Sequence, residues 1–294
     1  MSSIHDDDDI ARAIDATIAK LDQVKHEIGR VIFGQEQVIE ETLITLLAGG
    51  HALLVGVPGL AKTKLVETLG VTLGLDAKRI QFTPDLMPSD ILGAEVLDES
   101  STGKRSFRFI SGPVFAQLLM ADEINRASPR TQSALLQAMQ EQHITIAGAR
   151  HDLPKPFHVL ATQNPLEQEG TYPLPEAQLD RFLMEIDVDY PDRDAERRIL
   201  FETTGAEEAH AKPSMDAETL LTAQRLVRRL PVGDSVVEAI LTLVRAARPG
   251  TEGGEAGKLI AWGPGPRASQ ALMLAVRARA LLDGRLAPSI DDVL

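Results

Sequence analysis

The sequence predicts an α/β protein with a five-stranded parallel sheet, interrupted by hairpins, and a second, smaller domain made only of helices. Short apolar runs recur between residues 51 and 188, and the segments between them are long enough for helices. After residue 216 the apolar residues recur at helical spacing only. The predicted strands are His51–Val55, Arg79–Thr83, Ala116–Asp122, His158–Thr162 and Leu183–Val188, all read as buried.

The segment ahead of the sheet, Ile10 to Leu47, is predicted to be mostly helical, because its isoleucine, leucine and valine residues recur at helical spacing until Gly29 and Gly34 interrupt them. The four aspartates Asp6–Asp9 precede it. A divalent-ion or partner site is one interpretation of this run; a solvated tail or a helix start with matching charge is the favoured one. The acidic start is also unlike a secretory signal.

Two predicted hairpins interrupt the strand and helix alternation. The first pairs Ala94–Leu97 with Ser106–Ile110 across the turn-rich residues 98–104, and the second pairs Ile144–Ala147 with Arg150–Leu153 across Gly148 and Ala149. Such insertions are either functional arms or neutral decoration.

The domain boundaries follow from composition. Residues 1–202 are expected to form the α/β core with its N-terminal helix, residues 203–216 a Gly-, Ala-, Glu- and Pro-rich linker, and residues 217–294 a helical lid. Lid helices are predicted at Ala217–Leu230, Ser235–Ala247 and Arg267–Asp283. The chain stops part-way through what reads as another helix, so the natural protein is expected to continue.

Composition excludes several functions. The 294 residues carry a net charge of −13 and no block of basic residues, which disfavours broad binding to nucleic acid or anionic lipid, although an internal basic pore stays possible. The chain has no cysteine, which excludes disulfides, thiol catalysis and cysteine-held metals. Its apolar runs are too short to span a bilayer, so a cytoplasmic protein is expected.

A phosphate-binding loop is predicted directly after the first strand. An apolar run leads into a glycine-containing loop that ends in Lys-Thr, and a helix follows. Backbone N–H groups of such a loop and the N-terminus of the following helix attract phosphate. Lys62 is placed to reach the β- and γ-phosphates, and the Thr63 hydroxyl is placed to ligate Mg²⁺. Ala61 replaces the usual glycine, and we expect it to keep a negative φ. The predicted binding residues are Gly56, Val57, Pro58, Gly59, Leu60, Ala61, Lys62, Thr63 and Lys64.

A second acidic motif supports this prediction. The apolar run at 118–121 ends in Asp122 and Glu123. Asp122 would hold Mg²⁺, directly or through water, and Glu123 would orient and polarise the attacking water. A solvated strand end would explain the carboxylates alone but not their pairing with the loop. The strand predicted at Arg79–Thr83 lies between the two motif strands in the sequence, which leaves room for an additional strand between them in the sheet.

Three further polar residues are candidates. Asn164 follows the fourth strand, where open sheets bind ligands, although Asn before Pro is also an ordinary turn former. Arg181 follows a short predicted helix; it is either paired with the helix dipole or presented to the transferring phosphoryl group of a neighbouring subunit. Arg267 opens a lid helix, a position that does not favour a cation, so it is expected to contact an anion elsewhere.

Together, the order of these motifs resembles that of AAA+ ATPases. Three motifs resemble the MoxR branch specifically: Gly-Val-Pro-Gly-Leu-Ala-Lys-Thr, Ala-Asp-Glu-Ile-Asn-Arg and Glu-Ala-Gln-Leu-Asp-Arg-Phe. The resemblance runs from about Val31 to the last residue. MoxR proteins also carry alanine at the position of Ala61, so this departure supports the resemblance.

The resemblance implies roles by position. Gly56, Gly59, Lys62 and Thr63 match Walker A, Asp122 and Glu123 match Walker B, and Asn164 matches sensor 1. Arg181 matches the arginine finger that acts in trans and Arg267 matches sensor 2. The adenine is expected to lie against Ile32, Phe33, Gly34 and Gln35. The two hairpins match the helix-2 insert and the pre-sensor-1 insert of this clade.

The resemblance further implies Mg·ATP hydrolysis in a homo-oligomer, a hexameric ring, that acts with von Willebrand A-domain proteins to remodel or mature other complexes. Two alternatives stay open. A nucleic-acid-stimulated motor of the same clade would need basic hairpins, and here these offer Lys104, Arg105, Arg108 and Arg150, with His151 beside it. A nucleotide-gated adaptor would bind ATP and recruit a partner, with slow hydrolysis.

Overall fold

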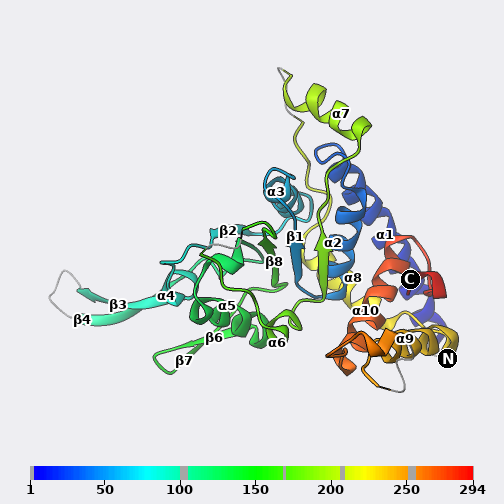
Figure 1. Cartoon of the computed structure of the whole chain (residues 1–294). Helices are drawn as coiled ribbons and strands as arrows, with labels where there is room; N and C mark the ends of the chain where they lie inside the picture. The colour runs from blue at the N-terminus through cyan, green and yellow to red at the C-terminus, as the bar shows by residue number, and fades with distance from the viewer. Residues whose placement is uncertain (1–2, 100–104, 168–169, 206–208, 251–255, 294) are drawn as a thin grey trace. The chain divides into compact units, whose positions relative to one another are not determined.

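The computed structural model describes residues 3–99, 105–167, 170–205, 209–250 and 256–293 (Figure 1). The chain forms two compact units, which we describe separately. The core unit contains residues 24–42 and 50–217, and the lid unit contains residues 1–23, 43–49 and 218–294. Helices α1 (Ser3–Gly29) and α2 (Glu36–Ala48) each contribute residues to both units.

The core unit is built on a five-stranded sheet with the order β2-β5-β8-β1-β9, in which every neighbouring pair is parallel. This confirms the predicted α/β class and the additional strand. The inserted strand between β1 and β5 is β8, whereas β2 lies at the sheet edge. The strands are β1 (Ala52–Val55), β2 (Ala77–Gln81), β5 (Leu118–Asp122), β8 (His158–Gln163) and β9 (Met184–Asp187).

The expectation that the second strand is buried was wrong. In β2 only Ile80 is buried, because an edge strand has a single neighbour and its other side chains contact solvent or the ends of β5. β2 also begins at Ala77, two residues earlier than predicted. By contrast, β5 is buried throughout, as expected for a central parallel strand.

Helices connect the strands and cover the sheet. α3 (Lys62–Thr72) links β1 to β2, and α5 (Pro129–Glu141) links β5 to the strands that follow. These two connections run in opposite directions across the sheet, so right-handed crossovers place them on opposite faces, as Figure 1 shows. Ser128 caps α5 by accepting a hydrogen bond from the Thr131 backbone N–H. The other helices are α4 (Pro88–Leu92), the 3₁₀ turn η1 (Ile124–Arg126), α6 (Glu176–Leu179) and α7 (Arg193–Thr203).

Both predicted hairpins are present. β3 (Gly93–Glu99) pairs with β4 (Arg105–Ser111) and projects from the sheet in Figure 1, while residues 100–104 of the predicted turn lie outside the described residues. β6 (His143–Ile146) pairs with β7 (Ala149–Asp152). The second turn lies one residue earlier than predicted, at Ala147 and Gly148, where both residues have positive φ.

The lid unit contains the predicted helices as α8 (Ala217–Arg229), α9 (Asp234–Ala246) and α10 (Pro266–Leu282), with the 3₁₀ turns η3 (Ala256–Lys258) and η4 (Ile290–Asp292). Its core is a cluster of five valine and isoleucine residues: Val236, Ile240, Val244, Val276 and Val293. Residues 1–23 group with this unit, unlike the expected 1–202 core, because α1 packs on the lid helices: Lys20 Nζ donates to Thr219 Oγ1 at 3.1 Å. In the described part of the chain, no helix combines the length and apolarity that a membrane span requires.

Candidate nucleotide-binding site

The loop between β1 and α3 has the geometry of a phosphate cradle. Gly59 has φ of +89°, which glycine adopts at little cost. Ala61 precedes the first residue of α3 and has φ 57° and ψ 18°, so the expected negative φ was wrong. The left-handed conformation turns the chain into α3, and it costs a residue with a Cβ roughly 1–2 kcal/mol. The backbone is therefore strained locally at Ala61.

Lys62 folds back over this loop. Its Nζ donates to the carbonyl oxygens of Gly56 at 2.6 Å and Val57 at 2.8 Å. Partial burial lowers the pKa of Lys62, while the nearby carboxylates of Asp122 and Glu123 act in the opposite direction. The ammonium group thus lies between the loop and the acidic strand end.

One cavity, of about 390 Å³, brings the two predicted motifs together. Its lining comes from the loop, from the end of β5 and from the end of β8, because carboxyl ends of parallel strands share one sheet edge. The lining residues are Pro58, Gly59, Leu60, Ala61, Lys62, Thr63, Lys64, Asp122, Glu123, Thr162 and Asn164. Gly56 and Val57 are not in this lining and contribute their carbonyl groups to Lys62.

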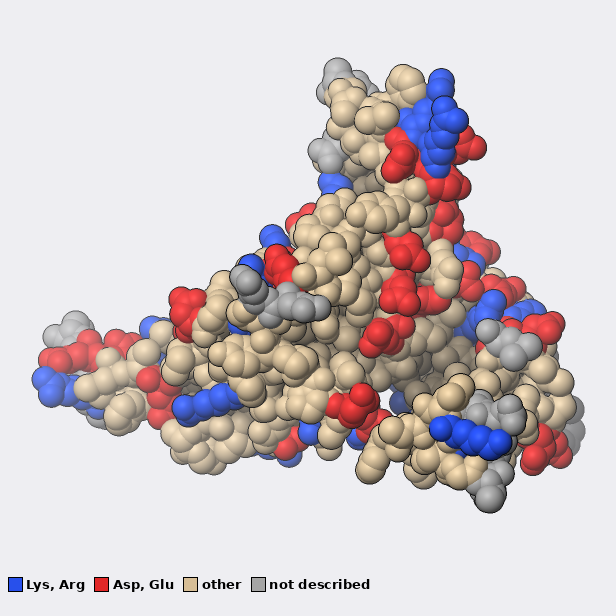
Figure 2. Space-filling model, viewed as in Figure 1, with Lys and Arg blue, Asp and Glu red and all other residues tan. Residues whose placement is uncertain are grey.

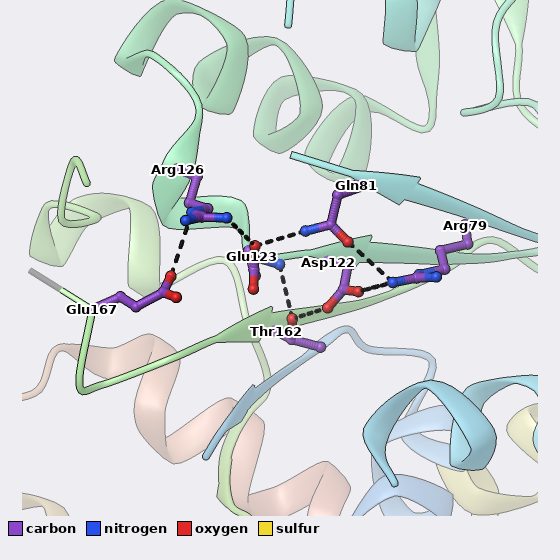
Figure 3. A network of polar contacts seen from close by, with 7 residues as sticks. All are labelled: Arg79, Gln81, Asp122, Glu123, Arg126, Thr162 and Glu167. Carbon is purple, nitrogen blue, oxygen red and sulfur yellow. Dashed lines mark hydrogen bonds and ion pairs between the residues drawn. The ribbon is translucent and has the colours of Figure 1, made fainter. Parts of the chain in front are cut away.

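Asp122 has protein donors on both carboxylate oxygens (Figure 3). The Thr162 hydroxyl donates to Oδ1 at 2.6 Å. The Arg79 guanidinium donates to Oδ2 through Nε at 3.1 Å and through a terminal nitrogen at 2.5 Å. The Asp122 side chain is only 12% exposed, so its orientation is well defined by these contacts.

Glu123 is held by a second set of contacts in the same view. Its φ of 55° turns the chain out of β5, and its backbone N–H donates to Thr162 Oγ1 at 2.8 Å. Its Oε2 accepts from Gln81 Nε2 at 2.7 Å and from Arg126 at 3.0 Å. Arg126 also contacts Glu167 at 3.3 Å. Thr162 therefore connects the two neighbouring acidic residues.

Asn164 is buried at the end of β8 and lines the cavity. Its Oδ1 accepts the Leu166 backbone N–H at 3.1 Å, which is the turn-forming contact expected of Asn before Pro. The contact confirms the turn interpretation, and Asn164 also lines the cavity, where its role toward a ligand stays a prediction.

A second, apolar cavity of about 230 Å³ adjoins the first, because Gly59, Leu60, Ala61 and Lys64 line both. Three of the four predicted adenine-contacting residues line it, and Gly34, with φ of +70°, forms the turn between them. Gln35 Nε2 donates to the Asp189 carbonyl at 2.9 Å, and the Arg198 guanidinium lies 4.6 Å from the centre of the Phe33 ring. The lining residues are Arg30, Val31, Ile32, Phe33, Gln35, Gly59, Leu60, Ala61, Lys64, Pro191, Ile199, Glu202, Thr203 and Ala209.

The two predicted arginines lie outside both cavities. Arg181 follows α6, and its guanidinium donates to the Leu136 carbonyl at 3.0 Å and to Gln140 Oε1, so it lies against α5. Arg267 is exposed in the first turn of α10 in the lid unit.

Sequence reasoning missed five residues of the polar network: Arg79, Gln81, Arg126, Thr162 and Glu167. A signal existed for the first two, since Arg79 and Gln81 alternate along a predicted strand and therefore share one face. Thr162 was a polar residue at the end of an otherwise apolar strand. Arg126 ends the motif Ala-Asp-Glu-Ile-Asn-Arg, to which sequence reasoning gave no role beyond the resemblance, and no local pattern pointed to Glu167.

Comparisons with known proteins agree with this geometry. The ATPase family associated with various cellular activities (AAA) matches residues 51–184, and the AAA lid domain matches residues 255–294. Chaperone MoxR1 of Mycobacterium tuberculosis is 43% identical over 277 residues, which cover 94% of this chain and 72% of that protein. Protein MoxR of Methylorubrum extorquens is 31% identical over 279 residues, covering 89% of this chain and 80% of that protein.

A solved structure has the same fold. The crystal structure of a Cytophaga hutchinsonii protein provisionally assigned as an ATPase superposes with a TM-score of 0.87 at 38% identity, covering 96% of this chain and 86% of that one. On the strength of these relatives and of the two motifs that meet in one cavity, the chain belongs to the MoxR family of AAA+ ATPases.

Proposed function

We propose that the chain binds Mg·ATP in the two adjoining cavities and hydrolyses it. The observation that carries the proposal is the cavity that collects the loop, both acidic residues and Asn164. The larger cavity has the lysine, the hydroxyl and the carboxylates that a triphosphate with Mg²⁺ requires, and the adjoining cavity is mostly apolar, as a nucleobase requires.

The residues suit Mg²⁺. The ion prefers oxygen ligands, and Thr63 and Asp122 supply a hydroxyl and a carboxylate at the rim of one cavity. When bound, Mg²⁺ would neutralise phosphate charge and orient the phosphoryl group. Asp122 would hold the ion and Thr63 would complete the protein's share of its shell.

The chain's own residues supply the other steps. Lys62 would leave the carbonyls of Gly56 and Val57 and pair with phosphate oxygens, which are stronger acceptors because they are charged. Glu123 would orient the attacking water and take its proton, and Asn164 would hold that water or the γ-phosphate. Arg181 of a second copy would stabilise the charge that develops on the transferred group, and Arg267 would contact the nucleotide from the lid.

The position of Arg181 supports a role in trans. Its guanidinium lies against α5 and not in either cavity of its own chain. If Arg181 acts on a phosphoryl group, that group would therefore be one bound by a neighbouring copy. By family resemblance, six copies would form a ring in the cytoplasm and would act, with a von Willebrand A-domain protein, as a chaperone on other complexes.

The nucleic-acid motor is the weaker candidate. In the hairpins, Arg105 pairs with Glu99 at 3.0 Å, Arg108 with Asp98 at 3.3 Å and Arg150 with Asp152 at 2.8 Å. Figure 2 shows acidic and basic side chains interleaved over the first hairpin on the face in view. Arginines neutralised by neighbouring carboxylates attract phosphate weakly. Lys104 lies outside the described residues.

The test of hydrolysis is Glu123→Gln, which keeps the size of the side chain and removes the base. Nucleotide binding should be retained, while ATP turnover should fall by roughly 100-fold or more. Arg150→Gln, on the second hairpin, is the matched control and should leave both unchanged. Unaltered turnover in Glu123→Gln would refute the role assigned to Glu123. Stimulation of the wild-type ATPase by DNA would instead favour the motor.

The shared site is tested by mixing two inactive variants. Arg181→Ala lacks the trans-acting group and Lys62→Ala lacks nucleotide binding, so mixed assemblies contain interfaces with both functional halves. Turnover should partly recover in the mixture. No recovery at any ratio would argue against a site built from two copies.

A further inference from the structure

The contact between Arg79 and Asp122 places a cation on the carboxylate that is expected to hold Mg²⁺. Two guanidinium nitrogens donate to Oδ2 at 3.1 and 2.5 Å, while Thr162 occupies Oδ1. A terminal nitrogen of Arg79 also donates to Gln81 Oε1 at 3.0 Å, which restrains the guanidinium in this position (Figure 3).

The ion pair is not needed to hold the edge strand in place. β2 and β5 already form a parallel ladder from Ala77 opposite Leu118 to Gln81 opposite Asp122. The Phe82 backbone N–H extends it by donating to the Asp122 carbonyl at 2.8 Å. A side chain without charge at position 79 could therefore occupy the same place on β2.

From this geometry we propose that Arg79 competes with the divalent cation for Asp122 and so sets the Mg²⁺ concentration at which the site fills. The inference rests on the proposed binding of Mg·ATP. Arg79 is a positioning residue, since it acts through Asp122 and not on the nucleotide.

The competition has a simple electrostatic basis. A carboxylate that already pairs with a guanidinium has part of its negative potential neutralised, and a divalent ion entering the same shell meets repulsion from the arginine. The Asp122 side chain is 12% exposed and that of Arg79 is 51% exposed, so solvent screens this repulsion in part. Mg²⁺ must therefore either displace the guanidinium or bind beside it, and both lower its affinity.

A purely orienting role predicts the opposite result. If Arg79 only aligned Asp122 for the metal, its removal would weaken Mg²⁺ binding. If it competes, its removal strengthens Mg²⁺ binding. The direction of the change therefore separates the two roles.

The experiment measures binding of a fluorescent ADP analogue by anisotropy, in EDTA and across a series of free Mg²⁺ concentrations. In Arg79→Gln, the Mg²⁺ concentration that gives half of the full gain in affinity should fall by roughly threefold to tenfold. Arg79→Lys keeps the charge but loses the two-nitrogen contact with Oδ2, so its value should lie between those of wild type and Arg79→Gln. Arg150→Gln removes an arginine from a more exposed ion pair on the second hairpin, away from both cavities, and should leave the value unchanged.

An unchanged or higher half-saturating Mg²⁺ concentration in Arg79→Gln would overturn the inference while leaving nucleotide binding, and with it the proposed function, in place. Absence of nucleotide binding in every variant, wild type included, would overturn both. Arg79→Met removes the same charge and gives an independent measurement if Arg79→Gln does not fold.

Discussion

Two buried histidines should make the core unit sensitive to mild acid. His51 precedes β1 and accepts the Val159 backbone N–H at Nδ1, at 2.9 Å, while His158 begins β8 and lies 2.7 Å from the Gly50 carbonyl through its Nδ1. The rings pack edge to face with centroids 6.4 Å apart. Burial lowers the pKa of His51 to about 3, with a further contribution from His158, and burial lowers the pKa of His158 to about 4.

The sign follows from the unfolded chain, in which both imidazoles have the ordinary pKa of 6.5. The folded core keeps them neutral, so the unfolded state binds more protons below pH 6.5 and stability falls as the pH is lowered toward the folded pKa values. At pH 5, about 1.5 units below the ordinary pKa, each histidine lowers the free energy of unfolding by about 2 kcal/mol, at about 1.4 kcal/mol per pH unit. The pair therefore costs about 4 kcal/mol, which for a protein of this size lowers the melting temperature by roughly 10 °C.

Differential scanning calorimetry between pH 7.5 and pH 5 measures this effect. The double variant His51→Gln/His158→Gln should melt at a lower temperature at pH 7.5, because its core packs less well, yet lose much less on acidification. His26→Gln, an exposed position on α1, is the control and should follow wild type. An equal drop in melting temperature for wild type and the double variant would refute the assignment to these histidines.

Further predictions concern the loop and the apolar cavity. Ala61→Gly should keep nucleotide binding and raise stability by less than about 1 kcal/mol, because relief of the left-handed strain is offset by greater freedom in the unfolded chain; a lower melting temperature would contradict this. Gly34→Ala should lower the free energy of unfolding by roughly 1–3 kcal/mol and weaken binding of a fluorescent nucleotide. The reason is that the new Cβ would meet Ala195 Cβ at 2.4 Å and Pro191 Cβ at 2.8 Å. An unchanged melting temperature and unchanged binding would show that the turn can adjust. Lys62→Ala should lower ATP affinity by on the order of 100-fold in the same binding assay, and wild-type affinity would remove Lys62 from the phosphate site.

Local patterns predicted most elements because the spacing of apolar residues reflects the face that each element buries. The five strands, the two hairpins and the three lid helices lie within a few residues of their predicted positions. The failures have local causes. β2 was read as buried because its sequence does not reveal that it has one neighbour, and Ala61 was given a negative φ because its methyl group favours one.

The domain division was less accessible to sequence. Residues 1–23 continue directly into the core along α1, yet they group with the lid. A helix pattern shows which side is apolar but not which surface covers that side. The contact of Lys20 with Thr219 joins residues almost 200 positions apart, and no local sequence pattern predicts it.

The sequence by itself determined the phosphate loop, the acidic strand end and the family, because each depends on residue types at short, fixed spacing. Only the tertiary structure decided what surrounds those groups: β8 lies beside β5, which lets Thr162 join Asp122 to Glu123, and β2 lies on the other side, which places Arg79 on Asp122. Strand order and register arise from long-range packing of the whole core, so contacts between residues about 40 positions apart appear only in the folded chain.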